Sequence, residues 1–286
     1  MTTPLTGSRY EFHITRQGAG QNKAAKSYHD LYAADEDKSF NKSDDIVGHI
    51  HSIDVGSTVD GPGIRFVLFT TGCPLRCVYC HNPDTWHKAN GRPVSINRIM
   101  KEIGKYEKGL RISKGGITLS GGEPLMQHDF SAEIFRRCKA LGIHTCLDTS
   151  GYMSERLSDE ELMNIDLVLL DIKSGDPDTH KRVTGRELDP VAAFARRLSD
   201  LKRPVWVRFV LVPGLTDDFE NVEKVADICA SIPSLERVEV LRFHQLGAEK
   251  WQKLHMDYPL KDTLPPSEEL TERVREQFRR RGLTTY

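Results

Sequence analysis

The chain has 286 residues, enough for one large α/β domain, since single barrels of about 250 residues are common. Its 40 Lys and Arg residues nearly balance 41 Asp and Glu residues, and the net charge of -1 argues against nucleic-acid or anionic-membrane partners. No apolar run approaches the roughly 18 residues of a membrane span, and the first residues lack the basic-then-apolar order of a signal peptide. We therefore expect a cytoplasmic protein.

Residues 1–45 are polar, and their apolar residues are too sparse and aperiodic to form a buried face. We expect a disordered N-terminal extension followed by one catalytic domain over residues 46–286. A transit peptide is the alternative reading of the extension. It is disfavoured because such peptides are poor in acidic residues, and this segment contains Asp30, Asp35, Glu36 and Asp37.

From residue 47 onward, short runs rich in β-branched residues alternate with amphipathic helical stretches, the pattern of repeated βα units. The expected strands are 64–70, 116–120, 143–148, 166–172, 205–212 and 237–243. Apolar stripes of helical period predict helices between them, over 96–103 behind a Ser95 cap, 130–141 before Gly142, 191–201 and 219–229. Six units are too few for an eight-stranded barrel, so we expect a partial (β/α)6 barrel of the TIM type or a doubly wound sheet. In both, functional groups gather at the carboxyl ends of the strands.

Three cysteines share the loop after the first expected strand, with Cys-x3-Cys-x2-Cys spacing: Cys73, Cys77 and Cys80. Three soft thiolates can hold three corners of a 4Fe-4S cluster and leave one iron open, because full protein ligation takes four. A structural zinc site is the alternative, with His81 or His87 as a fourth ligand. A ferredoxin-like carrier would need a fourth cysteine near by, and none occurs before Cys138.

The other three cysteines are isolated, at Cys138, Cys146 and Cys229. A disulfide framework would spread its pairs more evenly along the chain. These three fall on apolar faces, so we expect them to be small core residues without a functional role.

Polar motifs follow several of the expected strands. In Ser120-Gly121-Gly122-Glu123 the glycines could let backbone approach a ligand closely while Glu123 accepts from a cationic group. An ordinary glycine turn is the alternative explanation for the two glycines.

Two carboxylates, Asp148 and Asp171, end consecutive strands, where they could bind a cation with Thr149 or orient a ligand's hydroxyl groups. Just beyond Asp171, Lys173 could counter carboxylate charge, although a solvated lysine is the simpler explanation. At the end of the last strand, His244 occupies a position where barrel enzymes place functional groups.

Taken in chain order, these motifs resemble the activating enzymes of glycyl-radical enzymes, a family within the radical S-adenosylmethionine superfamily. The resemblance covers about residues 47–284. The segments that carry it are Asp60-Gly61-Pro62-Gly63-Ile64-Arg65-Phe66, Tyr79-Cys80-His81-Asn82, Ser120-Gly121-Gly122-Glu123-Pro124, Asp148-Thr149-Ser150-Gly151, Leu170-Asp171-Ile172-Lys173, Val212-Pro213-Gly214 and Phe243-His244-Gln245-Leu246-Gly247. Two departures are the long N-terminal extension and Pro124, where some members have alanine.

The resemblance implies a radical S-adenosylmethionine barrel with one 4Fe-4S cluster on Cys73, Cys77 and Cys80, and S-adenosylmethionine chelated to the open iron. Contacts to S-adenosylmethionine are implied for Tyr79, Cys80, His81, Gly121, Gly122, Glu123, Asp171, Ile172, Lys173 and His244. A monovalent cation is implied at Asp148, Thr149, Asp171 and the backbone carbonyl of Leu169. The family also places Asp60 near the substrate peptide, although the neighbouring glycines make a turn an equally good explanation.

The resemblance further implies reductive cleavage of S-adenosylmethionine to methionine and a 5′-deoxyadenosyl radical, which removes a hydrogen from a backbone glycine of pyruvate formate-lyase. Residues 81–120 contain no cysteine, which favours a single-cluster activator over relatives with a ferredoxin-like insert. With no second cluster or flavin motif, a flavodoxin or ferredoxin is expected to deliver the electron to a monomeric enzyme. The alternatives are a radical enzyme acting on a small molecule, as the deazapurine-forming carboxylate synthases do, or a non-catalytic zinc or electron-transfer protein.

Overall fold

The computed structural model describes residues 45–286, so nearly all of the expected extension, 1–44, lies outside the described residues. Within them the strands are β1 (Val47–Ser57), β2 (Arg65–Thr70), β3 (Arg92–Ser95), β4 (Gly116–Gly121), β5 (His144–Thr149), β6 (Leu167–Asp171), β7 (Val205–Leu211) and β8 (Leu235–Arg242). The α-helices are α2 (Ile96–Gly104), α3 (Glu107–Ile112), α4 (His128–Ala140), α5 (Asp159–Leu162), α6 (Pro177–Thr184), α7 (Asp189–Asp200), α8 (Phe219–Ala230), α9 (Ala248–Lys253) and α10 (Glu268–Arg279). Short 3-10 turns are η1 (Pro83–Thr85), η2 (Lys88–Asn90), η3 (Pro124–Gln127) and η4 (Ser154–Arg156).

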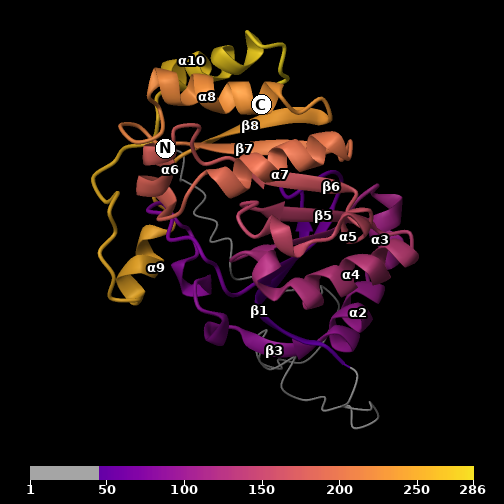
Figure 1. Ribbon diagram of the computed structural model, residues 1–286. Helices are drawn as coiled ribbons and strands as arrows, with labels where there is room; N and C mark the ends of the chain where they lie inside the picture. The colour runs from indigo at the N-terminus through magenta and orange to yellow at the C-terminus, as the bar shows by residue number, and fades with distance from the viewer. Residues whose placement is uncertain (1–44) are drawn as a thin grey trace, which may run out of the picture. The chain divides into compact units, whose positions relative to one another are not determined.

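The strands form one sheet in the order β3-β1-β2-β4-β5-β6-β7-β8 (Figure 1). From β2 to β8 every neighbouring pair is parallel, which confirms the six predicted βα strands and the partial-barrel fold class. The antiparallel strands β1 and β3 complete one edge and were not predicted. Most of β1 is only half-buried, so it lacks the continuous apolar run that identifies a central parallel strand.

Several helices combine an apolar stripe with a capping residue at one end. The Ser95 hydroxyl accepts from the Arg98 N–H at 3.2 Å to begin α2, and Asp218 begins α8 through the Asn221 N–H at 3.0 Å. Helix α4 ends before Gly142, whose φ of +67° is the left-handed conformation typical of a helix C-terminus.

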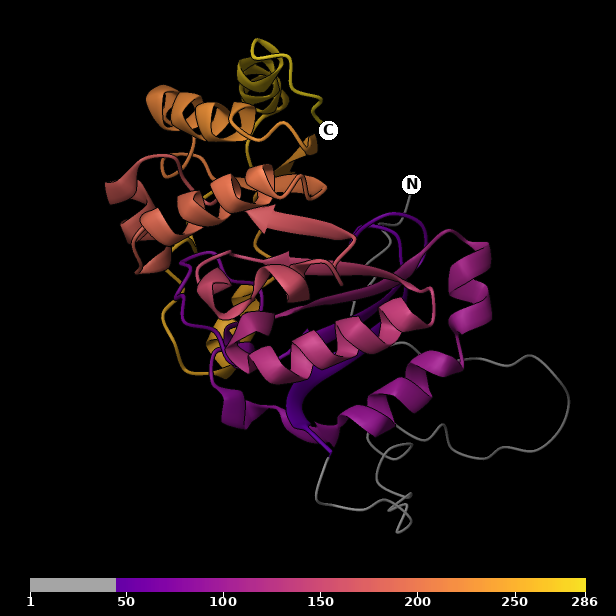
Figure 2. The ribbon, with the colours of Figure 1, turned by 45° about the vertical axis from the view of Figure 1, so that its right-hand side comes forward.

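Apolar residues from α2, α4, α7, α8 and α10 pack on one face of the sheet to form the main core. Figures 1 and 2 show α4, α7 and α8 on that side of the sheet, with α7 between α4 and α8. Two of the isolated cysteines, Cys138 and Cys229, are fully buried in this core. Cys146 belongs instead to a small cluster on the opposite face, with Leu167, Leu169 and Trp206. Among residues 45–286, none of the helices combines the length and apolar character needed to cross a membrane.

Candidate active site

The cysteine loop follows the carboxyl end of β2 and is held in place by its own backbone. The N–H groups of Gly72 and Cys73 donate to the carbonyls of Thr85 and Trp86, at 2.7 and 3.1 Å. Further along, the N–H groups of Arg76 and Val78 donate to residues at the end of α6, at 2.8 and 3.0 Å. The loop therefore has a defined shape before any cofactor binds, because two separate segments fix its two halves.

The three loop thiols are the first requirement for a 4Fe-4S cluster. Cys77 is buried and the other two are partly buried. Burial, followed by the influence of Cys77, raises the pKa of Cys73, and burial raises the pKa of Cys77 to about 12, opposed by Lys173. The thiols are thus close enough to disfavour each other's ionisation, and binding iron would have to displace their protons.

The remaining cysteines cannot complete this set, since Cys138, Cys146 and Cys229 are buried in other apolar clusters. Within residues 45–286, no three histidine, cysteine or carboxylate side chains converge on a point that could hold one metal ion. A 4Fe-4S cluster binds each thiolate to a different iron, so its ligands do not have to converge on one point. Three thiols on one preformed loop fit a cluster with one open iron.

The Gly-Gly-Glu segment packs against the cysteine loop. The Gly122 N–H donates to Thr70 at 2.9 Å, and a side chain at Gly122 would lie 2.4 Å from the Gly72 carbonyl oxygen. At Gly121 φ is +108°, and a Cβ there would lie 2.5 Å from the backbone of Thr70. The glycines allow close packing of two backbone segments, and their predicted contact with a cofactor stays a prediction.

Glu123 is almost fully buried, and its carboxylate bonds to the end of β5. It accepts from the Thr149 hydroxyl at 2.7 Å, from the Ser150 hydroxyl and N–H at 2.5 and 2.9 Å, and from the Leu125 N–H at 3.2 Å. Burial raises the pKa of Glu123, and these donors oppose the rise. Glu123 therefore connects two of the predicted motifs, and its contact with a cofactor stays a prediction.

Asp148 is the second-last residue of β5 and Asp171 is the last residue of β6, and the two carboxylates are close enough to influence each other. Asp148 accepts from the Ser120 hydroxyl at 2.6 Å, while its Oδ1 is buried without a hydrogen-bond partner among the described residues. Burial raises the pKa of Asp148 to about 6, against the influence of Arg208. Asp171 accepts from Lys173 at 2.9 Å. The hydroxyl of Thr149 bonds to Glu123, on the other face of β5, so the predicted cation ligands are not all brought together.

Lys173 links this carboxylate pair to the cysteine loop. Its ammonium lies 5.8 Å from the centre of the Tyr79 ring, a cation–π arrangement. Burial disfavours its charge, but Asp171 and Tyr79 together raise the pKa of Lys173 well above its usual value. The Tyr79 hydroxyl is itself buried and has no hydrogen-bond partner among residues 45–286. Two orphaned oxygens, on Tyr79 and Asp148, therefore lie at the strand ends where a polar cofactor is expected.

The predicted histidines also come together, although they are 163 residues apart. The rings of His81 and His244 are stacked, with centroids 4.3 Å apart, and His81 Nε2 lies 3.3 Å from the His244 carbonyl oxygen. Trp251 in α9 donates to the Cys80 carbonyl at 2.8 Å, which anchors the segment after β8 to the cysteine loop.

Asp60 lies in a bend in which φ is +124° at Gly61 and +65° at Gly63, backbone conformations that favour glycine, and its role toward the substrate stays a prediction. Its carboxylate accepts from the Ser57 hydroxyl at 2.5 Å and lies 3.7 Å from Arg208. The same guanidinium lies 3.4 Å from Asp148 and 3.1 Å from Glu239.

Arg208 therefore lies at the centre of three carboxylates on this face, and its role was not predicted from the sequence. The available signal was a single cation inside the apolar strand Val205–Leu211, where an arginine is costly unless carboxylates surround it.

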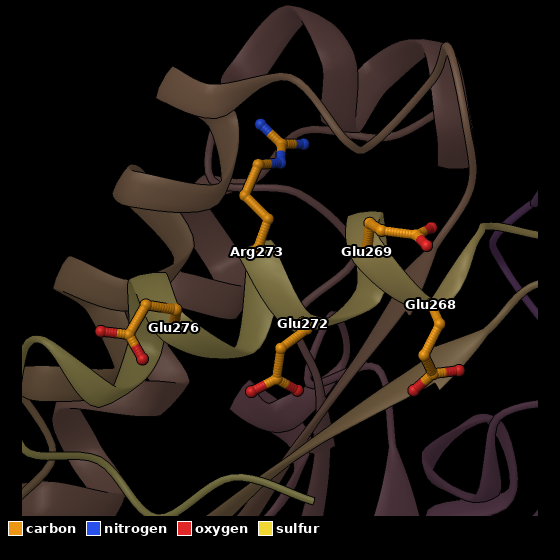
Figure 3. Close-up of a pocket in the computed structure, with 5 residues that line it drawn as sticks. All are labelled: Glu268, Glu269, Glu272, Arg273 and Glu276. Atoms are coloured by element: carbon orange, nitrogen blue, oxygen red, sulfur yellow. The ribbon is translucent and has the colours of Figure 1, made fainter.

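Another hollow lies beside α10, away from these residues. Figure 3 shows its lining side chains on a single helix: Glu268, Glu269, Glu272, Arg273 and Glu276. They are the solvated face of α10, and Glu268 and Glu272 already pair with Arg275 and Arg279. We assign no site to this hollow.

The fold and the three-cysteine loop define a class, and comparison with known proteins agrees. The model of the radical SAM superfamily matches residues 67–226. A Streptococcus suis SuiB structure bound to S-adenosylmethionine shares the fold, with a TM-score of 0.58 at 14% identity, over 79% of this chain and 50% of that chain. The chain belongs to the radical SAM superfamily.

Within that superfamily, sequence comparison narrows the family. The pyruvate formate-lyase-activating enzyme of Staphylococcus epidermidis is 46% identical over 240 residues, covering 81% of this chain and 94% of the relative. That of Staphylococcus aureus is 45% identical over 229 residues, covering 78% and 91%. A domain of the Bacteroides vulgatus enzyme aligns with a TM-score of 0.50 at 27% identity, over 60% of this chain and 98% of that chain. The chain belongs to the family of pyruvate formate-lyase-activating enzymes, and neither alternative function is favoured.

Proposed function

We propose that this protein activates pyruvate formate-lyase by removing one hydrogen atom from a backbone glycine of that enzyme, leaving a glycyl radical. The observation that carries the proposal is 46% identity to an activating enzyme across 94% of the relative's length. The site supports it, because three thiols on one loop leave a cluster with one position open to a cofactor.

Cys73, Cys77 and Cys80 would hold the 4Fe-4S cluster, and S-adenosylmethionine would lie against the strand ends beside it. When bound, the two supply a one-electron reductive cleavage to methionine and a 5′-deoxyadenosyl radical that takes the hydrogen atom. Lys173, with its raised pKa, offers a permanent positive charge to a ligand carboxylate. Tyr79 and Asp148 offer the unpartnered oxygens, a donor or acceptor on Tyr79 and an acceptor on Asp148.

The remaining predicted contacts form the rest of this cofactor site: His81 and His244 as a stacked pair, Gly121, Gly122 and Glu123 behind the cysteine loop, and Ile172 beside Asp171. We include the monovalent cation on Asp148, Thr149, Asp171 and the Leu169 carbonyl, although only Asp148 and Leu169 are paired in strand register and the Thr149 hydroxyl bonds to Glu123. Its test is whether cofactor cleavage responds to exchanging potassium for a large organic cation at constant ionic strength.

The protein's own task is to hold the reacting groups in line and exclude side reactions. Asp60 would face the glycine-bearing segment of the substrate, held by Ser57 and Arg208. We further propose a monomer in the cytoplasm that receives its electron from a flavodoxin or ferredoxin.

The test is anaerobic incubation of the reduced, iron-loaded protein with S-adenosylmethionine and pyruvate formate-lyase, followed by electron paramagnetic resonance. A glycyl doublet on pyruvate formate-lyase is expected, with about one 5′-deoxyadenosine formed per radical. Cofactor cleavage without a doublet would contradict the assigned substrate, and a zinc protein without iron or sulfide would contradict the chemistry.

A further inference from the structure

Four basic side chains surround the outer edge of the cysteine loop, and we call them the basic rim: Arg76, Lys88, Arg156 and Arg186. All four are exposed. They come from four separate segments of the chain: the loop itself, η2, η4 and the turn after α6. The fold therefore gathers onto one edge positive charge that is scattered through the sequence.

The rim is attached directly to the backbone that carries the thiols. Arg76 donates to the carbonyls of Cys73 and Leu75 at 2.7 and 2.8 Å, and Arg186 donates to the Pro74 carbonyl at 2.8 Å. Each residue uses one nitrogen of its guanidinium in these bonds, and the Arg76 and Arg186 guanidiniums also lie 5.0 and 6.0 Å from the ring centres of Trp86 and Tyr152. The remaining N–H groups of each guanidinium are available to a partner because both side chains are exposed.

The other two members flank the same edge. The Cβ of Lys88 lies 3.5 Å from the point where a Cβ of Gly72 would be, and the side chain of Met126 is equally close. Arg156 reaches the Met126 carbonyl at 3.4 Å. The basic rim thus borders the loop from Gly72 to Arg76.

Carboxylates do not neutralise this charge within the described residues. None of the four forms an ion pair there, whereas most other arginines of the domain do. Of the two acidic residues next to them in sequence, Glu155 and Glu187, the second is held by Lys181 at 2.8 Å. The chain as a whole has a net charge of -1, so the basic rim is a local feature.

The position of the basic rim beside the cysteine loop fits a role in electron transfer. The proposed reaction requires one electron from outside, and the loop that the basic rim borders carries the three thiols. Small electron-transfer complexes bury little area and rely on complementary charge for encounter and orientation. An acidic partner that binds the basic rim would lie against the loop that carries the thiols, so the electron would have only the loop to cross.

We propose that the basic rim is the docking surface for an acidic one-electron carrier protein, such as a flavodoxin, which is oxidised by one electron as the bound cluster is reduced by one. This inference rests on the proposed function. It assigns Arg76 and Arg186 the central positions, with Lys88 and Arg156 at the sides.

The test measures affinity as well as activity. Iron-loaded protein is titrated with oxidised flavodoxin at low and moderate salt, using Arg186→Glu, Lys88→Glu and the double variant. We expect each single change to raise the Kd by roughly three- to tenfold at low salt, with a shallower salt dependence. Arg186→Lys, which keeps the charge, should retain most of the affinity.

The matched control is Lys108→Glu in α3, because this exposed residue precedes β4 and so lies at the amino end of the sheet, opposite the cysteine loop. Figure 1 shows α3 at one end of the sheet and α6 at the other. The affinity of the Lys108→Glu variant for flavodoxin should match that of the unaltered protein.

Reduction rates separate this inference from the proposed function. Reduced flavodoxin should reduce the cluster of the Glu variants several-fold more slowly at subsaturating concentration, while photoreduction by a small deazaflavin proceeds at an unchanged rate. Unchanged flavodoxin affinity in the double variant would overturn the docking surface. So would a double variant that binds pyruvate formate-lyase more weakly but binds flavodoxin as tightly as the unaltered protein. Absence of a glycyl radical after deazaflavin reduction would instead overturn the proposed function.

Discussion

Buried polar groups at the two ends of the sheet differ in how fully they are satisfied, as Arg65 and the pair Tyr79 and Asp148 show. At the amino end, Arg65 is fully buried, and its guanidinium donates to the Thr118 hydroxyl at 3.0 Å, the Pro62 carbonyl at 3.2 Å and also the Ile117 carbonyl. At the carboxyl end, oxygens of Tyr79 and Asp148 are buried without partners among the described residues. Satisfied polar groups stabilise a fold, whereas orphaned ones lower its stability until a ligand satisfies them.

The largest effect is expected at the carboxyl end. Cys77→Ala should abolish formation of 5′-deoxyadenosine, because a cluster ligand is lost. The fold should survive, since the loop is held by backbone hydrogen bonds and the main core lies on the other face of the sheet. Anaerobic product analysis together with iron content and circular dichroism measures both.

Cys138→Ala is the matched control, because this cysteine is buried in the main core. It should lower the free energy of unfolding by about 1 kcal/mol through lost packing and leave cofactor cleavage intact. Lost activity in a well-folded Cys138 variant would show that this cysteine was wrongly assigned to the core alone.

At the amino end, the expected effect is on stability alone. Arg65→Met should lower the free energy of unfolding by about 3 kcal/mol, because it leaves the buried Thr118 hydroxyl and two carbonyls without their donor. Urea denaturation measures the change, and the folded fraction should cleave the cofactor normally. If Arg65→Met lost as much cofactor cleavage per folded molecule as Cys77→Ala, the amino end of the sheet would contribute to cleavage as well as to stability.

A buried histidine extends the comparison into pH dependence. His180 in α6 is fully buried, and neither ring nitrogen has a hydrogen-bond partner among residues 45–286. Burial, reinforced by Lys173, lowers the pKa of His180 from 6.5 to about 4. The folded protein thus binds fewer protons than the unfolded chain between these values, so stability is full above pH 6.5 and falls as the pH is lowered to 4.

The expected contribution of His180 over that interval is up to about 3 kcal/mol. Its measurement is the difference in unfolding free energy between the unaltered protein and His180→Leu, followed from pH 7 to pH 4. The difference should shift in favour of the variant as the pH falls. A constant difference would mean that the pKa of His180 is the same in the folded and the unfolded protein.

The smallest stability effect should come from Tyr79→Phe. Removing an oxygen that has no partner should leave the stability of the cofactor-free protein within about 0.5 kcal/mol or increase it slightly. Binding of S-adenosylmethionine to the iron-loaded variant should weaken by roughly tenfold if the hydroxyl contacts the cofactor. Calorimetry checks the affinity, and unchanged binding would remove Tyr79 from the cofactor site.

The sequence by itself determined the six parallel strands, the helices that join them and the three-thiol loop, because periodic burial and cysteine spacing are local patterns. It also identified Asp148, Asp171 and Lys173 from their positions at strand ends. The antiparallel strand β1 was not predicted, because its residues are mostly half-buried and show no continuous apolar run.

Only the tertiary structure decided which distant groups meet. In the folded chain Glu123 accepts hydrogen bonds from Thr149 and Ser150, and the rings of His81 and His244 are stacked. Arg208 lies at the centre of three carboxylates. The tertiary structure also assembled the basic rim from four segments. These features depend on the relative depth and register of neighbouring strands and loops, which no local pattern contains, since each residue taken alone fits an ordinary turn or a solvated charge.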